Sequence, residues 1–336
     1  MTDRKMLTLN TQVNIARPTA TRMWLVFCCA SLAMVQSAIG DAGASFAVAV
    51  AALVSAVLTE LLMTSNVHGL KKIKDGSAAA SAMVLTLLLP NQIHPVYAAL
   101  GAAFAMVVVK HSFGGLGSNW MNPALGGWLF ICCSWPQAFA RALDKSAEYI
   151  PQAGSAADQA IGDFLNNVLF RFLGAQLPPG YIDLFSRQSP GIIADRAVLA
   201  LVLAIAVIAA FEISRSWLSL LYLAVFGFLI RMMGDGGSWW NGDVILAFFS
   251  GGTLVAAFIL IVDPSTGAKS MPGNVIVVIL AALLSVAFRV FASALYGCFY
   301  AVALVNALTP LLCKVERRLL FSLSPAEGST FFGGVR

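Results

Sequence analysis

Long apolar stretches recur along almost the whole chain, and they constrain its fold more than any other feature. A helix that crosses the hydrocarbon core of a bilayer needs about 20 apolar residues, and fewer where the helix is broken. The chain is 59% hydrophobic and only 11% charged, whereas soluble domains are roughly 45–50% apolar and about 25% charged. A globular core could not hide this much apolar surface, but lipid can. The sequence therefore predicts an all-α polytopic membrane protein.

Ten stretches qualify as membrane spans. We predict them at residues 23–41, 43–66, 77–90, 95–112, 122–140, 195–213, 215–233, 241–262, 273–291 and 293–313. They leave an N-terminal tail (1–22), one sizeable extramembrane segment (141–194) and a C-terminal tail (314–336).

Basic residues indicate the orientation, because Lys and Arg gather in cytoplasmic loops. With the N-terminus inside, most of the 21 lysines and arginines fall on the inner side, among them Lys71, Lys72 and Lys74. Long loops such as 141–194 translocate largely regardless of charge. We therefore expect both termini in the cytoplasm. The net charge of +5 has the same origin, since no basic stripe with interleaved aromatics indicates nucleic-acid binding.

The two halves of the span series, 23–140 and 195–313, share a pattern. The third span ends in Leu88-Leu89-Pro90, and the eighth ends in Val262-Asp263-Pro264. In both halves an apolar helix, a glycine-containing stretch and a helix with Asn and Pro follow. An odd number of spans per half would make the two five-helix repeats inverted, as in many transporters. Chance similarity between apolar segments is the alternative.

Two polar breaks at membrane depth in the first half are candidate functional sites. Asp75, Gly76 and Ser77 open the third span, where they could cap the helix or leave its start free to hold an anion. The second break lies between spans four and five, where glycines permit an unusual backbone path and amides offer both donors and acceptors. Its candidates are Gly114, Gly115, Gly117, Asn119 and Asn122. A simple turn is the alternative for this break.

Two further breaks lie in the second half. Gly251, Gly252 and Thr253 interrupt the eighth span, where small residues allow close helix packing or room for a planar ligand. Asp263 follows at the cytoplasmic edge. It is either a helix-end residue or part of a cation path.

No catalytic or metal-binding residues are expected in this chain. Serine-hydrolase triads, P-loops and dinucleotide fingerprints are absent from the sequence. Six cysteines lie in apolar stretches without metal-ligand spacing, which is typical of small buried hydrophobic residues. The adjacent pairs Cys28-Cys29 and Cys132-Cys133 leave one alternative, as thiolate ligands of an iron–sulfur cluster shared with a partner.

Together these motifs resemble one family, the D subunit of the Rnf electron-transport complex, which is similar to the B subunit of the sodium-translocating NADH:quinone reductase. The glycine–asparagine–proline stretch is the most specific of the matching pieces. In the family's order, over residues 60–310, these pieces are Lys74-Asp75-Gly76-Ser77-Ala78; Phe113-Gly114-Gly115-Leu116-Gly117-Ser118-Asn119 with Asn122-Pro123-Ala124; Tyr181-Ile182-Asp183-Leu184-Phe185 with Pro190-Gly191; and Ser250-Gly251-Gly252-Thr253 through Asp263-Pro264.

The resemblance implies a membrane component of a complex that couples electron transfer between ferredoxin and NAD to Na⁺ or H⁺ transport. It implies the bacterial inner membrane as location and other Rnf subunits as partners, especially the flavin-carrying G subunit and the C and B subunits that face NADH and ferredoxin. A stand-alone channel or transporter with a duplicated five-helix fold is the alternative. A purely structural scaffold within the complex is a third reading.

The resemblance also implies FMN, esterified to a threonine in an extracytoplasmic Ser-Gly-Ala-Thr-Pro-Leu motif between spans five and six. This sequence departs from that pattern, because residues 141–194 contain no threonine. Alignment back from Tyr181 places Asn167, which has no hydroxyl, at the acceptor position. Another placement puts Ser155 there. We therefore expect no covalent FMN. FMN or riboflavin, if bound, would be held non-covalently by the residues of the first three breaks.

Overall fold

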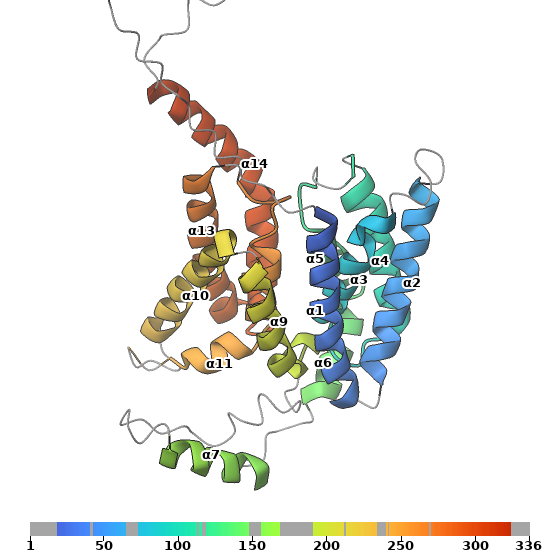
Figure 1. Cartoon of the computed structure of the whole chain (residues 1–336), viewed down its shortest axis with the longest axis vertical. Coiled ribbons are helices and arrows are strands. Elements are labelled where there is room, and N and C mark those ends of the chain that lie inside the picture. Colours follow the sequence, from blue (N-terminus) through green and yellow to red (C-terminus); the bar gives the residue numbers. More distant parts are fainter. Residues whose placement is uncertain are drawn as a thin grey trace, which may run out of the picture.

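A computed structural model of the chain describes residues 19–40, 43–64, 73–112, 114–115, 119–147, 156–168, 191–211, 213–233, 240, 242–268 and 270–323. Within these ranges the protein is helical, and its one β-type contact is an isolated bridge between Pro90 and Ile192 (Figure 1). The predicted N-terminal tail, apart from its last four residues, lies outside the described residues, as do Gly117 and Ser155.

Five of the described helices are long and apolar enough to cross a membrane. They are α1 (Thr19–Gly40), α2 (Ala44–Thr64), α10 (Ile213–Met233), α13 (Met271–Phe291) and α14 (Gly297–Leu323). Shorter apolar helices are α3 (Ser77–Leu88), α4 (Pro95–Phe104) with its π-helical continuation η3 (Ala105–His111), α5 (Pro123–Ser134) and α9 (Val198–Phe211). The chain is thus a multi-pass membrane protein, as predicted.

Two predicted spans are divided in the structure. The span expected at 122–140 ends as α5 at Ser134, because Pro136 begins a new helix, α6 (Pro136–Ala147), and Trp135 before it is not helical. A residue that precedes proline is disfavoured in the α conformation. The span expected at 241–262 consists of α11 (Val244–Phe249), α12 (Thr253–Val255) and the π-helical η6 (Ala256–Leu260), separated at Gly251 and Gly252.

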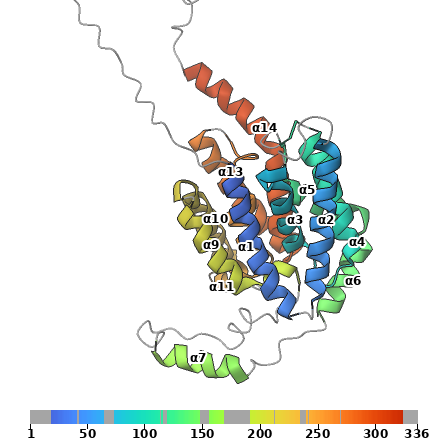
Figure 2. The same ribbon diagram turned by 45° about the vertical axis from the view of Figure 1, so that its right-hand side comes forward.

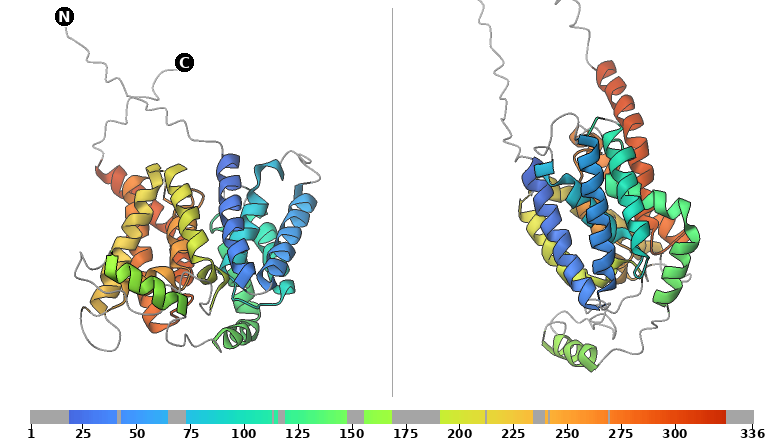
Figure 3. Two further views of the ribbon diagram at one scale, coloured as in Figure 1. Left: turned by 60° about the horizontal axis from the view of Figure 1, so that its bottom comes forward. Right: turned by 90° about the vertical axis from the view of Figure 1, so that its right-hand side faces the viewer.

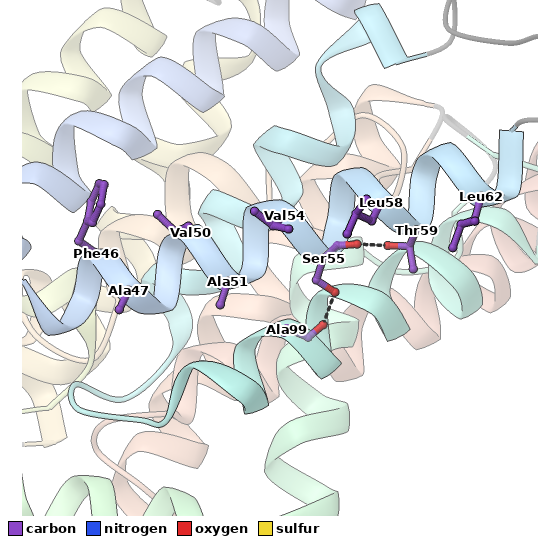
Figure 4. Close-up of a pocket in the computed structure, with 10 residues that line it drawn as sticks. All are labelled: Phe46, Ala47, Val50, Ala51, Val54, Ser55, Leu58, Thr59, Leu62 and Ala99. Carbon is purple, nitrogen blue, oxygen red and sulfur yellow. Dashed lines mark hydrogen bonds between the residues drawn. The ribbon is translucent and has the colours of Figure 1, made fainter.

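On α2, small side chains are buried and large apolar side chains are exposed, as expected of a helix that faces lipid on one side. Small residues such as Ala52 and Ala56 are fully buried against neighbouring helices, whereas Phe46 and Leu62 are 60% and 72% exposed. Small residues let membrane helices approach closely, while large apolar ones can face lipid. Figure 4 shows the large side chains along α2 beside α4, where Ser55 Oγ donates to Ala99 O at 2.6 Å. They border an open groove of about 680 Å³ with an almost wholly apolar lining, which matches hydrocarbon chains.

The two halves of the chain lie side by side (Figure 2). α1 packs against both α3 and α9, so it bridges the halves. The amide of Ala200 donates to Gln36 Oε1 at 2.6 Å across this contact. α3 packs among α1, α2 and α5, while η6 packs among α9, α10 and α14. Each half therefore surrounds one short helical segment with other helices of the bundle.

One helix of the predicted extramembrane segment, α7 (Ala156–Val168), lies apart from the bundle (Figure 3). The start of α1 and the end of α14 lie at the opposite end of the molecule from α7 (Figure 1). That arrangement gives the helical part of the chain two distinct ends, which are called here the α7 end and the terminal end.

Candidate functional site

Two interrupted helices, α3 and α12–η6, run in opposite directions through the bundle. At the end of α3, the amide of Ile193 donates to Leu89 O at 2.9 Å. Two residues on, the Asp195 carboxylate accepts hydrogen bonds from Gly251 N and Gly252 N, both at 3.0 Å, at the start of α12. The end of α3 and the start of α12 therefore lie at the same end of the bundle.

The reverse contact occurs at the terminal end. Asn122, at the start of α5, donates from Nδ2 to Asp263 Oδ2 at 2.7 Å, just beyond the end of η6. Ser77, the first residue of α3, lines the same cavity as these two residues. The start of α3 and the end of η6 therefore meet, and the polar breaks predicted around Ser77, Asn122 and Asp263 come together in space.

Asp75 and Gly76 shape the start of α3. Asp75 Oδ1 accepts hydrogen bonds from Ser77 N at 2.9 Å and from Ser77 Oγ at 2.7 Å, so the carboxylate caps the helix. Gly76 has a φ of 70°, and a Cβ there would lie 2.8 Å from the indole of Trp24. Because Asp75 already binds the first amide, the predicted capping role is realised, and less of the helix start is free for an anion.

A buried ion pair that the sequence pattern did not indicate adjoins this helix start. Lys110 Nζ donates to both carboxylate oxygens of Glu60 at 2.8 Å and to Ser77 Oγ at 2.7 Å. Glu60 is 1% exposed and Lys110 is 2% exposed. His111 Nε2 lies 3.0 Å from Glu60 Oε2. The available signal was Glu60 itself, since an acid inside an apolar span usually has a buried partner.

A cavity of about 50 Å³ lies beside the ion pair, between the two halves of the chain. We call it the inter-half cavity. Polar side chains from α1, α3, η3, the η3–α5 connection and the segment after η6 line it. They are Arg22, Ser77, Ser81, Lys110, Asn119, Asn122, Asp263 and Ser265.

Asn119 and Asp263 both line the cavity, but the side-chain oxygens of Asp263 accept hydrogen bonds whereas that of Asn119 does not. Asn119 Oδ1 is buried and has no hydrogen-bond partner. Asp263 Oδ1 accepts from Ser265 N at 3.0 Å and Ser265 Oγ at 2.8 Å, and its Oδ2 accepts from Asn122. Arg22 donates to Val262 O at 3.1 Å. The cavity thus presents one unused acceptor beside a carboxylate.

The inter-half cavity does not fit a flavin. Pockets for ligands of that class measure about 300–1,000 Å³, whereas this cavity has about 50 Å³. Gly114 and Gly115 do not line it, and their amides instead close η3 by donating to His111 O and Lys110 O. Asn167 lies exposed on α7. The prediction of a non-covalent flavin stays a prediction, and the cavity residues fit water or a small ion.

The break at Gly251, Gly252 and Thr253 is packed by protein. Both glycine amides bind Asp195, which is 3% exposed and was not predicted from the sequence. A Cβ at Gly252 would lie 2.3 Å from Phe299 Cζ. The single O–H of Thr253 is shared between two carbonyl acceptors of the break, Ala247 O at 2.8 Å and Ser250 O at 2.9 Å. A planar ligand, for which the sequence indicated room at this break, would have to displace the Asp195 and Phe299 side chains from the two glycines.

In each of the two adjacent cysteine pairs, the two side chains differ in their surroundings. Cys28 is exposed whereas Cys29 is buried, and Cys133 is exposed whereas Cys132 lies 3.3 Å from Tyr300 Oη. Adjacent residues on a helix point about 100° apart because a turn takes 3.6 residues. A cluster shared with a partner would therefore take one thiolate from each pair more readily than two.

Comparison with known proteins gives one consistent family. The sequence profile of the NQR2, RnfD, RnfE family matches residues 7–321. The D subunit of the proton-translocating ferredoxin:NAD(+) oxidoreductase complex of Clostridium ljungdahlii is 27% identical over 276 residues, 82% of this chain and 83% of the relative. The D subunit of the Na(+)-translocating ferredoxin:NAD(+) oxidoreductase complex of Acetobacterium woodii is 26% identical over 278 residues, 81% of each. The D subunit of the ion-translocating oxidoreductase complex of Methanosarcina acetivorans is 25% identical over 263 residues, 78% of this chain and 77% of the relative.

Proposed function

Because the chain belongs to the NQR2, RnfD, RnfE family, we propose that it is the membrane-embedded D subunit of an Rnf-type ion-translocating oxidoreductase complex. The complex couples electron transfer between ferredoxin and NAD to the movement of Na⁺ or H⁺. The similarity to the D subunits of such complexes over about four-fifths of the chain carries this proposal. Enzymatic activity belongs to the complex, and this chain contributes to the ion path.

The proposed architecture is ten membrane spans in two inverted five-helix repeats. The opposite directions of α3 and α12–η6 support it. Each helix starts after a glycine with positive φ, 70° at Gly76 and 63° at Gly252. Each ends shortly before a proline, Pro90 or Pro264. Inverted repeats with discontinuous helices that meet near a shared site are a common plan of secondary transporters.

Asp263 is the proposed ion-path residue. It follows the C-terminal end of a discontinuous helix, where the aligned peptide dipoles leave partial negative charge that favours a cation. It also lies where the two halves meet, through its bond to Asn122. An ion that binds Asp263 Oδ2 would share that oxygen with Asn122, so ion binding and the contact between the halves are linked.

The remaining assignments follow the family. The chain lies in the bacterial cytoplasmic membrane with both termini inside, which the placement of α1's start and α14's end at one end supports (Figure 1). Its partners are other Rnf proteins, especially the G, C and B subunits. Any FMN or riboflavin is bound non-covalently, because neither Asn167 nor any other residue of 141–194 is a threonine.

Ion transport by sealed inverted vesicles tests this function. Vesicles that carry the complex should take up Na⁺ or H⁺ when reduced ferredoxin and NAD⁺ are supplied. D263N should reduce the uptake per electron at least tenfold, while D163N, which changes an exposed carboxylate on α7, should leave it unchanged. Co-purification with other Rnf subunits distinguishes this function from a stand-alone channel. Undiminished uptake by D263N would remove Asp263 from the ion path.

A further inference from the structure

We propose that the inter-half cavity is a binding site for a small monovalent cation, with Asn119 Oδ1 as a ligand and the Asp263 carboxylate as the counter-charge. The proposal rests on the proposed function and specifies it, because it names the ligand class and adds Asn119 to the ion site. The sequence pattern indicated Asn119 as a flavin contact, which the size of the cavity does not support.

The unused oxygen of Asn119 is the first observation. Asn119 is 6% exposed and lines the cavity, and its Oδ1 has no hydrogen-bond partner. Buried polar atoms in native proteins are nearly always paired with protein, water or a ligand. An amide oxygen is an acceptor only, so its missing partner is a hydrogen-bond donor or a cation.

Arg22, Lys110 and Asp263 are the charged side chains that line the cavity, and their hydrogen bonds leave Asp263 able to bind a cation. The guanidinium of Arg22 donates to Val262 O at 3.1 Å rather than to Asp263. Lys110 uses its three N–H groups on Glu60 and Ser77, and the Glu60 carboxylate neutralises it. The pair therefore adds no net charge to the cavity. Asp263 accepts three hydrogen bonds from neutral groups, whereas a carboxylate has about four lone-pair positions. One position on Asp263 therefore remains for a cation, at the negative end of η6.

Two properties of the cavity indicate which cation fits. One is its volume, and the other is that Asp263 is its single carboxylate without a cationic hydrogen-bond partner. About 50 Å³ admits an alkali cation with a water molecule, since one water needs at least about 10–15 Å³ measured in this way. Calcium takes 6–8 oxygen ligands, commonly with several carboxylates. One carboxylate with amide and hydroxyl oxygens instead suits Na⁺ or Li⁺.

Equilibrium binding of ²²Na⁺ to the purified full complex, in choline buffer, tests the proposal. N119L removes the ligand oxygen and keeps the same number of side-chain heavy atoms and the branch at Cγ. Its expected effect is the loss of one Na⁺ per complex or at least a tenfold weaker site. N306L is the matched control. Asn306 is also buried, at 4% exposure, but its unpaired atom is the donor Nδ2 and it does not line the cavity.

A second variant covers the case in which N119L fails to assemble. N119D keeps an oxygen and adds a negative charge, so it should bind Na⁺ at least as tightly as the wild type at pH 8. Na⁺ binding by N119L equal to that of N306L in number and affinity would overturn the proposal, as would weaker binding by N119D or a wild-type complex without Na⁺ binding. These results leave the proposed function standing if vesicles still couple electron transfer to ion uptake. Vesicles without such uptake would remove the proposed function itself.

Discussion

The Lys110 ammonium donates to both carboxylate oxygens of Glu60 at 2.8 Å, and neither side chain is more than 2% exposed. The two residues come from α2 and η3, so the pair joins two membrane helices next to the start of α3. Removing one partner of a buried pair leaves an uncompensated charge, whereas removing both is often neutral. We therefore expect a single substitution in this pair to lower the stability of the first half more than substitution of both residues does.

K110M should destabilise the protein by about 3–5 kcal/mol, because the buried Glu60 carboxylate then keeps only His111 Nε2, at 3.0 Å, as a side-chain partner among the described residues. The double variant E60Q/K110M should recover most of that loss. The midpoint of thermal denaturation of the purified complex, followed by intrinsic fluorescence, measures both effects. Equal midpoints for K110M and the double variant would show that charge burial is not the cause.

G252A should prevent accumulation of the folded chain. The added Cβ would lie 2.3 Å from Phe299 Cζ, at a φ of 63°. G43A is the matched control, because Gly43 has a φ of 90° with no atom within 4 Å of the added Cβ. That control should cost only the left-handed backbone strain of about 1–2 kcal/mol. Quantified membrane-fraction yield compares the two, and similar yields would contradict the packing seen around Gly252.

D195N should loosen the start of α12. An amide that replaces the carboxylate would direct its NH₂ group at one of the two glycine amides, and a buried donor left unpaired costs about 1–3 kcal/mol. Hydrogen exchange measured by mass spectrometry should show faster exchange at Gly251 and Gly252. D163N, on the exposed face of α7, should leave that exchange unchanged. Unaltered exchange rates of these two amides in D195N would contradict their hydrogen bonds to the Asp195 carboxylate.

Denaturation of the purified complex in acid should release any flavin from this chain. The reason is the absence of threonine from residues 141–194, since an Asn amide cannot form a phosphoester. After gel electrophoresis in acid, we expect no flavin fluorescence at the chain's 35.5 kDa. Non-covalent flavin would appear in the supernatant instead, and a fluorescent band at this mass would show a covalent link.

The interrupted helices show how far the sequence predicts this fold. Hydropathy located helices in every predicted span, and glycines and prolines located the breaks at Gly76, Pro90, Gly252 and Pro264. It did not predict the division at Trp135, although Pro136 carried that signal. Ten spans in inverted repeats remain a proposal, because five of the described helices have the length and composition of a full crossing.

The sequence by itself determined that the chain is a helical membrane protein with polar breaks at membrane depth. Those properties follow from the apolar length, glycine and proline content of each segment. Only the tertiary structure decided which breaks meet. Glu60 and Lys110 are 50 positions apart, Asp195 and Gly251 56, and Asn122 and Asp263 141. Such pairs depend on how helices pack against one another, so no local pattern encodes them.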